Sequence, residues 1–140
     1  MRKPARLRDV QKFTGCLASG GRFLSRLGER ALPLYQLMKK TSPFEWNGKA
    51  DEAFQDLKHM LSTAPVLAAP TDKELLLLYI AATSRAVSKV LVVERPEKGK
   101  IQAIQRPVYY LSEVLSASKQ NYPHYQKMCY GVYFTAKKLK

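Results

Sequence analysis

Residues 75–111 read LLLLYIAATSRAVSKVLVVERPEKGKIQAIQRPVYYL, and their short apolar runs separated by turn residues set the fold class. Runs of this length and composition are typical of β-strands, and Pro and Gly mark the turns between them. The pattern predicts strands at about 75–83, 86–94 and 101–111, the first of them buried. Because the connections are short, consecutive strands are expected to pair as antiparallel hairpins.

The N-terminal segment predicts short helices. Its apolar residues recur at helical spacing, but glycines at 15, 20 and 21 interrupt the pattern, so we expect two short helices with a bend between them. A third helical piece spans 33–40 and begins with a proline, which is tolerated in a first helical turn. The apolar stripe of the first two helices is Val10, Phe13, Leu17, Leu24 and Leu27.

A fourth helix is predicted at 48–62. Asn47 is a suitable N-cap, and acidic residues at 51 and 52 complement the helix dipole in the first turns. We expect a loop at 41–48 before it, and Pro65 follows its end. The face expected to be buried contains Ala53, Phe54, Leu57 and Leu61.

The chain closes with a strongly periodic helix at about 121–140. Apolar residues step by three and four along it, and we expect this face to pack on the sheet. The predicted fold class is therefore mixed α/β (α+β), with three antiparallel strands plus a helix, preceded by short helices. The face of the last helix is Tyr122, Tyr125, Cys129, Val132, Ala136 and Leu139.

Length and composition narrow the class of protein. At 140 residues, the chain forms one small domain or part of a larger one. Its longest apolar run, residues 75–82, is far shorter than the roughly 20 residues of a membrane span, and no apolar segment follows the basic N-terminus. We expect an intracellular protein that is neither secreted nor membrane-bound. Two isolated cysteines, Cys16 and Cys129, are expected to be reduced core thiols, and no zinc or other metal site is expected.

The net charge of +13 is concentrated at the two ends of the chain. Residues 1–40 carry +8, residues 41–80 carry −3 and residues 81–140 carry +8. Such a distribution favours binding of a polyanion, most commonly nucleic acid, although a solvated basic surface without a ligand is the alternative. The candidate phosphate contacts are Arg22, Arg26, Arg30, Lys39, Lys40, Lys127, Lys137 and Lys138.

Three blocks of sequence resemble one family. Residues 10–40 (VQKFTGCLASGGRFLSRLGERALPLYQLMKK), 44–70 (FEWNGKADEAFQDLKHMLSTAPVLAAP) and 106–122 (RPVYYLSEVLSASKQNY) are similar to the reverse transcriptases of gypsy-type long-terminal-repeat retrotransposons. The resemblance implies that 1–43 is the helical end of the polymerase thumb, or connection, and that 44–140 is part of an RNase H-like domain. It implies a truncated RNase H-like fold whose sheet has a free edge where a fourth strand would pair.

The resemblance also bears on catalysis. Active family members cleave RNA in RNA–DNA hybrids with carboxylates that hold two divalent metal ions, and Mg²⁺ prefers such hard oxygen ligands. Aligned on the family motifs, the first Asp position is Ala81 and the Glu position is Met128, while 75–93 and 114–140 contain no Asp or Glu. The resemblance therefore implies a degenerate, plant-type domain that is not an enzyme and has no cofactor, Mg²⁺ being expected only for active members.

The expected function is that of a non-catalytic connection between a polymerase and a downstream nuclease. Such a module would support the nucleic-acid duplex electrostatically. Its expected partners are an RNA–DNA hybrid or other nucleic acid, bound weakly and without specificity, and the rest of the polyprotein. Two alternatives remain: a standalone basic nucleic-acid-binding module, and a decayed fragment without present function.

Overall fold

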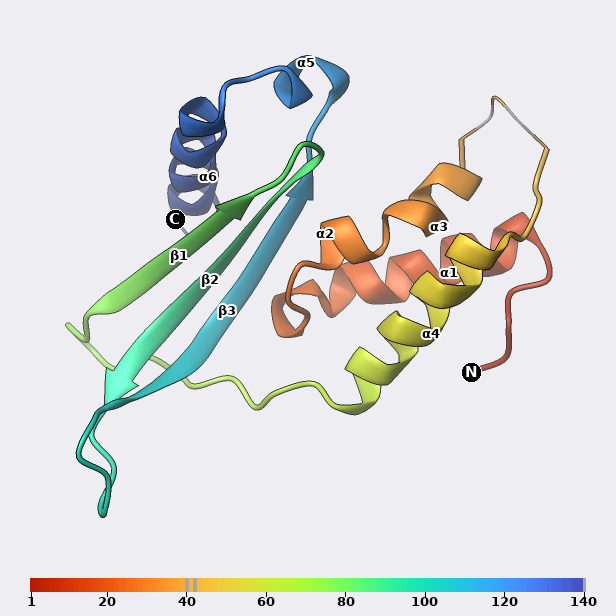
Figure 1. Ribbon diagram of the computed structural model, residues 1–140. Helices are drawn as coiled ribbons and strands as arrows, with labels where there is room; N and C mark the ends of the chain where they lie inside the picture. Colours follow the sequence, from red (N-terminus) through yellow and green to blue (C-terminus); the bar gives the residue numbers. More distant parts are fainter. Residues whose placement is uncertain (40, 42, 140) are drawn as a thin grey trace.

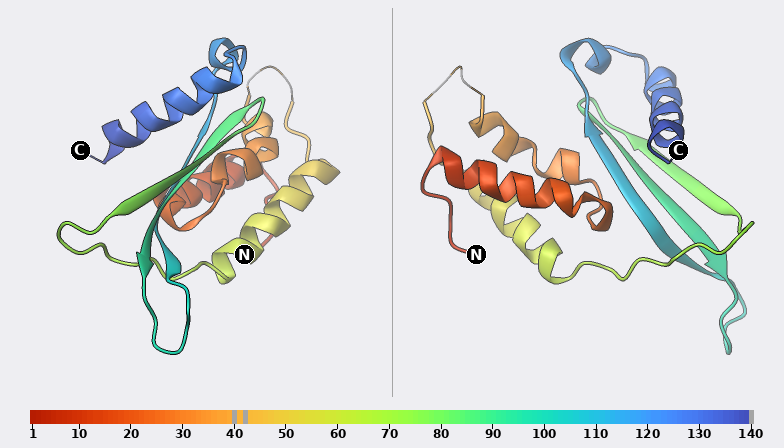
Figure 2. Two further views of the ribbon diagram at one scale, coloured as in Figure 1. Left: turned by 60° about the vertical axis from the view of Figure 1, so that its left-hand side comes forward. Right: turned by 180° about the vertical axis from the view of Figure 1, so that it is seen from behind.

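A computed structural model describes residues 1–39, 41 and 43–139. A bundle of N-terminal helices lies on one side of a three-stranded sheet, and the last long helix lies on the other side (Figure 1; Figure 2). No helix in the described ranges has the length and hydropathy needed to cross a membrane. The elements are α1 (Leu7–Ser19), η1 (Gly21–Phe23), α2 (Leu27–Arg30), α3 (Leu32–Leu37), α4 (Gly48–Ser62), β1 (Leu76–Ala82), β2 (Ala86–Arg95), β3 (Ile104–Val114), α5 (Ala117–Gln120) and α6 (His124–Lys138).

The sheet has the predicted antiparallel order β1-β2-β3, so β2 is central and the other two strands are edges. Leu91 of β2 pairs with Leu78 on one side and Tyr109 on the other, and an irregularity in register follows at Val92. The third strand begins at Ile104 rather than at residue 101, because Ile101 lies fully exposed in the preceding turn. The prediction of a buried first strand was wrong: β1 is only half-buried, because nothing in the described chain pairs with its outer edge.

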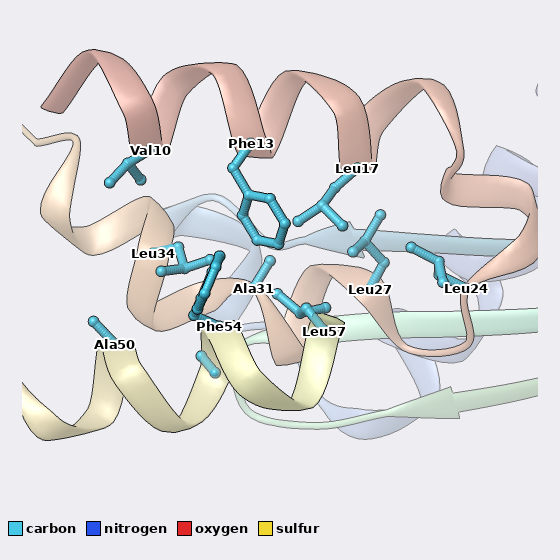
Figure 3. Packing of buried hydrophobic residues seen from close by; sticks show 11 residues of the cluster. Val10, Phe13, Leu17, Leu24, Leu27, Ala31, Leu34, Ala50, Phe54 and Leu57 are labelled. Carbon is cyan, nitrogen blue, oxygen red and sulfur yellow. The ribbon is translucent and has the colours of Figure 1, made fainter. Parts of the chain in front are cut away.

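The bundle has its own apolar core. All five residues of the predicted N-terminal stripe are buried, and they meet the inner face of α4 (Figure 3). At the centre, the rings of Phe13 and Phe54 pack edge to face with centroids 4.9 Å apart, and Leu34 of α3 is fully buried beside them.

Helix α4 starts and ends as the sequence predicts. The Asn47 side chain accepts a hydrogen bond of 2.8 Å from the Ala50 amide, which satisfies one of the free N–H groups of the first turn. Ala53, Phe54 and Leu57 are buried, but the prediction for Leu61 was wrong, since it is 37% exposed. The last turn of α4 extends beyond the helices that it packs against (Figure 1).

The face of α6 that packs on the sheet is opposite to the predicted one. Lys127, Gly131 and Thr135 are buried, whereas the apolar stripe lies outside: Tyr125 is 66% exposed and Val132 is 52% exposed. The remaining stripe residues, Tyr122, Cys129, Ala136 and Leu139, are exposed as well. Both cysteines are exposed, so the prediction that Cys16 and Cys129 are core thiols was wrong.

Close packing explains this choice of face. A Cβ atom added at Gly131 would lie 3.0 Å from Ile80 Cγ2 and 3.1 Å from Val87 Cγ1. The glycine therefore allows the backbone of α6 to approach β1 and β2 more closely than any side chain would permit. The larger residues of the stripe do not fit in this narrow space.

A second glycine brings the bundle against the sheet. The Gly28 amide donates a hydrogen bond to Ser112 Oγ, and an added Cβ would lie 3.0 Å from that oxygen and 3.4 Å from the Glu113 backbone. Helix α2 thus contacts β3 almost backbone to backbone. This contact fixes the position of the bundle relative to the sheet.

Two alanine substitutions in helices test the packing of α6. Gly131→Ala should lower the free energy of unfolding by about 1–2 kcal/mol, because the stiff β-branched side chains of Ile80 and Val87 cannot swing away from the new methyl group. Gly15→Ala is the control, since an added Cβ there meets nothing within 4 Å, and it should raise stability by up to about 1 kcal/mol. Urea unfolding followed by circular dichroism measures both, and equal effects would contradict the close approach.

Candidate nucleic-acid interface

A groove of about 520 Å³ runs along β3, between the helical bundle and α6. Its bundle side is formed by α1, η1, α2 and α3, its floor by β3, and its other side by the C-terminal half of α6. The groove therefore lies where three parts of the chain meet. The charged and aromatic residues that line it are Arg22, Tyr35, Tyr109, Tyr110, Glu113, Phe134 and Lys138.

Two of the predicted phosphate contacts, Arg22 and Lys138, come together in this groove from the two ends of the chain. The Arg22 guanidinium lies 5.0 Å from the ring centroid of Phe23, and the Lys138 ammonium lies 5.7 Å from that of Phe134. Within the described ranges, neither cation is paired with a carboxylate. Both charges are therefore available to an anionic ligand.

Two other predicted contacts are already paired. Arg26 Nη2 lies 2.7 Å from a carboxylate oxygen of Glu29, on the same turn of chain. Arg30 donates to both carboxylate oxygens of Asp56, at 3.0 and 2.9 Å, and so ties α2 to α4. Such partly exposed pairs are modest in energy, but they reduce the attraction of these arginines for phosphate.

The remaining predicted contacts divide into three cases. Lys127 is only 7% exposed, and its ammonium donates to the Thr83 and Ser84 carbonyls, at 3.3 and 3.4 Å, at the turn between β1 and β2. Its charge is thus buried in a structural contact rather than presented to solvent. Lys39 and Lys137 are exposed but do not line the groove. Lys40 lies outside the described residues.

A polar cluster that the sequence did not reveal holds Glu113. The Tyr130 hydroxyl donates to the Glu113 carboxylate, with oxygen–oxygen distances of 2.7 and 2.9 Å, and the Lys119 ammonium donates to that hydroxyl at 2.8 Å. The hydrogen bond to Tyr130 raises the pKa of Lys119, and burial raises the pKa of Tyr130. The cluster compensates the charge of Glu113, so the cations on the groove walls determine the net charge of its described lining.

Lys89 is buried next to this cluster. It is 3% exposed, and its ammonium has no hydrogen-bond partner within the described part of the chain. The ammonium lies 4.0 Å from the ring centroid of Phe134, in position for a cation–π interaction. Burial lowers the pKa of Lys89 to about 8. The attraction of Glu113 raises this pKa by less than burial lowers it, and repulsion from Lys138 lowers it further. Lys89 therefore carries a charge that destabilises the fold.

The two positions that the resemblance assigns to lost carboxylates do not meet in one cavity. Ala81 pairs with Ser88, and Ser88 pairs with Ser112, across the face of the sheet that is turned toward the bundle. Ala81 lines a cavity of about 270 Å³ there, whereas Met128 lies half-buried on α6 and does not line it. Among the residues described, no group of three or more His, Cys, Asp or Glu side chains is placed to hold a metal ion.

Comparison with known proteins identifies the family. Residues 46–140 match the family of RNase H-like domains found in reverse transcriptase, and the chain belongs to that family. It is 31% identical over 120 residues to a Pol polyprotein of feline endogenous virus ECE1, covering 86% of this chain and 11% of the relative. It is 32% identical over 124 residues to the Gag-Pol polyprotein of avian reticuloendotheliosis virus, covering 86% of this chain and 10% of the relative. The chain thus spans about a tenth of the length of these relatives.

Solved structures show the same fold. The foamy viral protease-reverse transcriptase in complex with an RNA/DNA hybrid matches 98% of this chain with a TM-score of 0.77 and 18% identity, over 18% of its own length. The same protein in complex with double-stranded DNA matches 99% of this chain with a TM-score of 0.75, over 29% of its length. The predicted RNase H-like fold, and the resemblance to reverse transcriptases at the level of the family, are confirmed.

Replacing Lys89 with an apolar residue tests its buried charge. Above pH 8 the folded chain loses the Lys89 proton, while the unfolded chain keeps it up to its usual pKa of 10.5, so stability rises with pH in this window. Lys89→Met should therefore raise the free energy of unfolding by about 1–3 kcal/mol at neutral pH, and its advantage should shrink toward pH 10.5.

The control for this prediction is Lys137→Met, which replaces an exposed lysine of α6. It removes one positive charge without removing a buried one, so its effect should be small at every pH. Urea unfolding at several pH values measures both variants. A loss of stability in Lys89→Met at neutral pH would contradict the prediction.

Proposed function

We propose that this chain is a non-hydrolytic RNase H-like module of a gypsy-type retroelement polyprotein, of the degenerate type found in plant lineages. Residues 1–43 are proposed to be the helical end of the polymerase thumb or connection, and 44–140 part of the RNase H-like domain. The module links a polymerase to a downstream nuclease and contacts the nucleic acid that passes between them.

The observation that carries this proposal is the row Ala81, Ser88 and Ser112 across the sheet. Ala81 occupies the strand position that the resemblance assigns to a metal-binding Asp. A methyl group and two neutral hydroxyls do not supply the anionic oxygens that Mg²⁺ prefers, and neither does the thioether of Met128. These residues do not fit a magnesium site, so no hydrolytic step is proposed for this chain and no cofactor is assigned to it.

A role in binding nucleic acid is supported by two observations. The structural neighbours include a foamy viral protein in complex with an RNA/DNA hybrid and with double-stranded DNA. In this chain, Arg22, Lys39, Lys137 and Lys138 are without a carboxylate partner among the described residues, and they come from both basic ends of the sequence. Contacts of this kind attract phosphates without reading the base sequence, so binding is expected to be weak and non-specific.

Incubation of the purified chain with a labelled RNA–DNA hybrid and Mg²⁺ tests the absence of hydrolysis. No cleavage is expected, because the chain lacks the carboxylates that hold the metal ions. An active ribonuclease H on the same hybrid is the positive control. Mg²⁺-dependent cleavage that scales with the concentration of the chain over independent preparations would contradict the proposal.

The salt dependence of hybrid binding tests the electrostatic role. Since about two to four cations contact phosphates, the logarithm of the affinity should fall linearly with the logarithm of the salt concentration, with a slope of about −2 to −4. Fluorescence anisotropy with a labelled hybrid measures this slope, and double-stranded DNA of the same sequence should give a similar one. A flat salt dependence, or no binding at low salt, would remove nucleic-acid binding from the proposed function.

A further inference from the structure

We propose that the groove along β3 binds a single-stranded segment of nucleic acid, with a base inserted between the helical bundle and α6. This inference rests on the proposed function and names the form of nucleic acid that the groove accepts. It concerns the groove along β3 rather than the cavity at Ala81, and Tyr110 lines both.

The dimensions of the groove favour one strand over two. Its volume of about 520 Å³ is within the range of sites that enclose a small molecule, about 300–1,000 Å³. A base with its sugar fits such a space, whereas a duplex can only rest across the rims. Because the bundle is held by the Gly28 contact and α6 by the Gly131 contact, the two walls are fixed by close backbone packing.

The chemistry of the groove also fits a nucleotide. Tyr35 from α3 and Phe134 from α6 line its two walls, whereas Tyr109 and Tyr110 are neighbours on β3 and turn to opposite faces of the sheet. Aromatic rings are the usual stacking partners of unpaired bases. Arg22 on one wall and Lys138 on the other place a cation on either side of the space, where phosphates that flank an inserted base would pass. The groove thus combines the two elements of single-strand recognition, a stacking surface and a basic track.

The carboxylate of Glu113 does not change this conclusion. It accepts hydrogen bonds from the Tyr130 hydroxyl, and the Lys119 ammonium lies 3.9 Å away. Its charge is therefore compensated from the side of α5 and α6. An acidic peptide would satisfy Arg22 and Lys138 equally well, but it would leave the aromatic lining without flat partners, so we favour nucleic acid.

Fluorescence anisotropy with a labelled single-stranded DNA of about 8 nucleotides tests the proposal on the full chain. The groove variant is Arg22→Ala combined with Lys138→Ala. The matched control is Lys39→Ala combined with Lys137→Ala, which removes the same charge from exposed positions outside the groove. The groove variant should weaken single-strand binding by about tenfold or more, and the control should weaken it only by a small factor.

Unlabelled competitors distinguish single-strand binding from duplex or acidic-peptide binding. A duplex of the same sequence should displace the single strand poorly, and the groove variant should affect duplex binding no more than the control does. Equal losses in the two variants, or efficient displacement by the duplex or by polyglutamate, would overturn this inference while leaving the proposed function intact. Failure of the chain to bind any nucleic acid would overturn both.

Photocrosslinking gives a second readout that does not depend on charge removal. A single strand carrying 5-bromouracil, irradiated with ultraviolet light, should attach at Tyr109, Tyr110 or Phe134. Tandem mass spectrometry must locate the attached residue itself, because Tyr133 and Phe134 are adjacent in the sequence. Attachment to the outer face of α6, at Tyr125 or Tyr133, would place the base elsewhere and overturn the inference. Circular dichroism of each variant should match that of the wild-type chain, since all four substituted cations lie at the surface.

Discussion

The contact between Gly28 and β3 is the constraint on which the arrangement of this molecule depends. The bundle has its own core around Phe13 and Phe54, and the sheet has its own cover in α6, so each could pack independently. Gly28 joins them at backbone distance, with its amide bonded to Ser112 Oγ. A side chain at this position would push the bundle away from β3 and widen the groove. Arg22 and Lys138 therefore line the same groove because residue 28 has no Cβ atom.

The distribution of charge around β3 follows from what each cation can reach. Arg30 is bound by Asp56, Lys127 by two turn carbonyls, and Lys119 by the Tyr130 hydroxyl. The buried Lys89 ammonium faces the Phe134 ring and has no hydrogen-bond partner among the described residues. Burial of this charge costs the folded state free energy at neutral pH. The exposed cations that line the groove, Arg22 and Lys138, have no carboxylate partner in the part of the chain that the structure describes. Within the groove, the cations available to a polyanion are therefore Arg22 and Lys138.

The order of elements could be predicted from the sequence because it depends on local patterns. Apolar runs between turn residues predicted the strands, and Asn47 marked the start of α4. The packed face of α6 could not be predicted from periodicity, because the close approach at Gly131 favours small residues and a lysine stem over the more apolar stripe. Sequence reasoning named Arg22 and Lys138 as candidates, but nothing local indicated that they share a groove. The Glu113–Tyr130 hydrogen bond is likewise a long-range contact with no pattern in the sequence.

The two edge strands of the sheet, β1 and β3, have different surroundings. Strand β1 contains no charged residue, and the exposed apolar face of α6, including Tyr125 and Val132, belongs to the helix that covers β1 and β2. Strand β3 is flanked instead by the cationic groove and by the bundle. Because β2 lies between them, an anion held at β3 does not contact the apolar edge, and burial of that edge would not displace it. The apolar edge at β1 and the cationic groove at β3 therefore lie on opposite edges of the sheet, and α6 contributes to both surroundings.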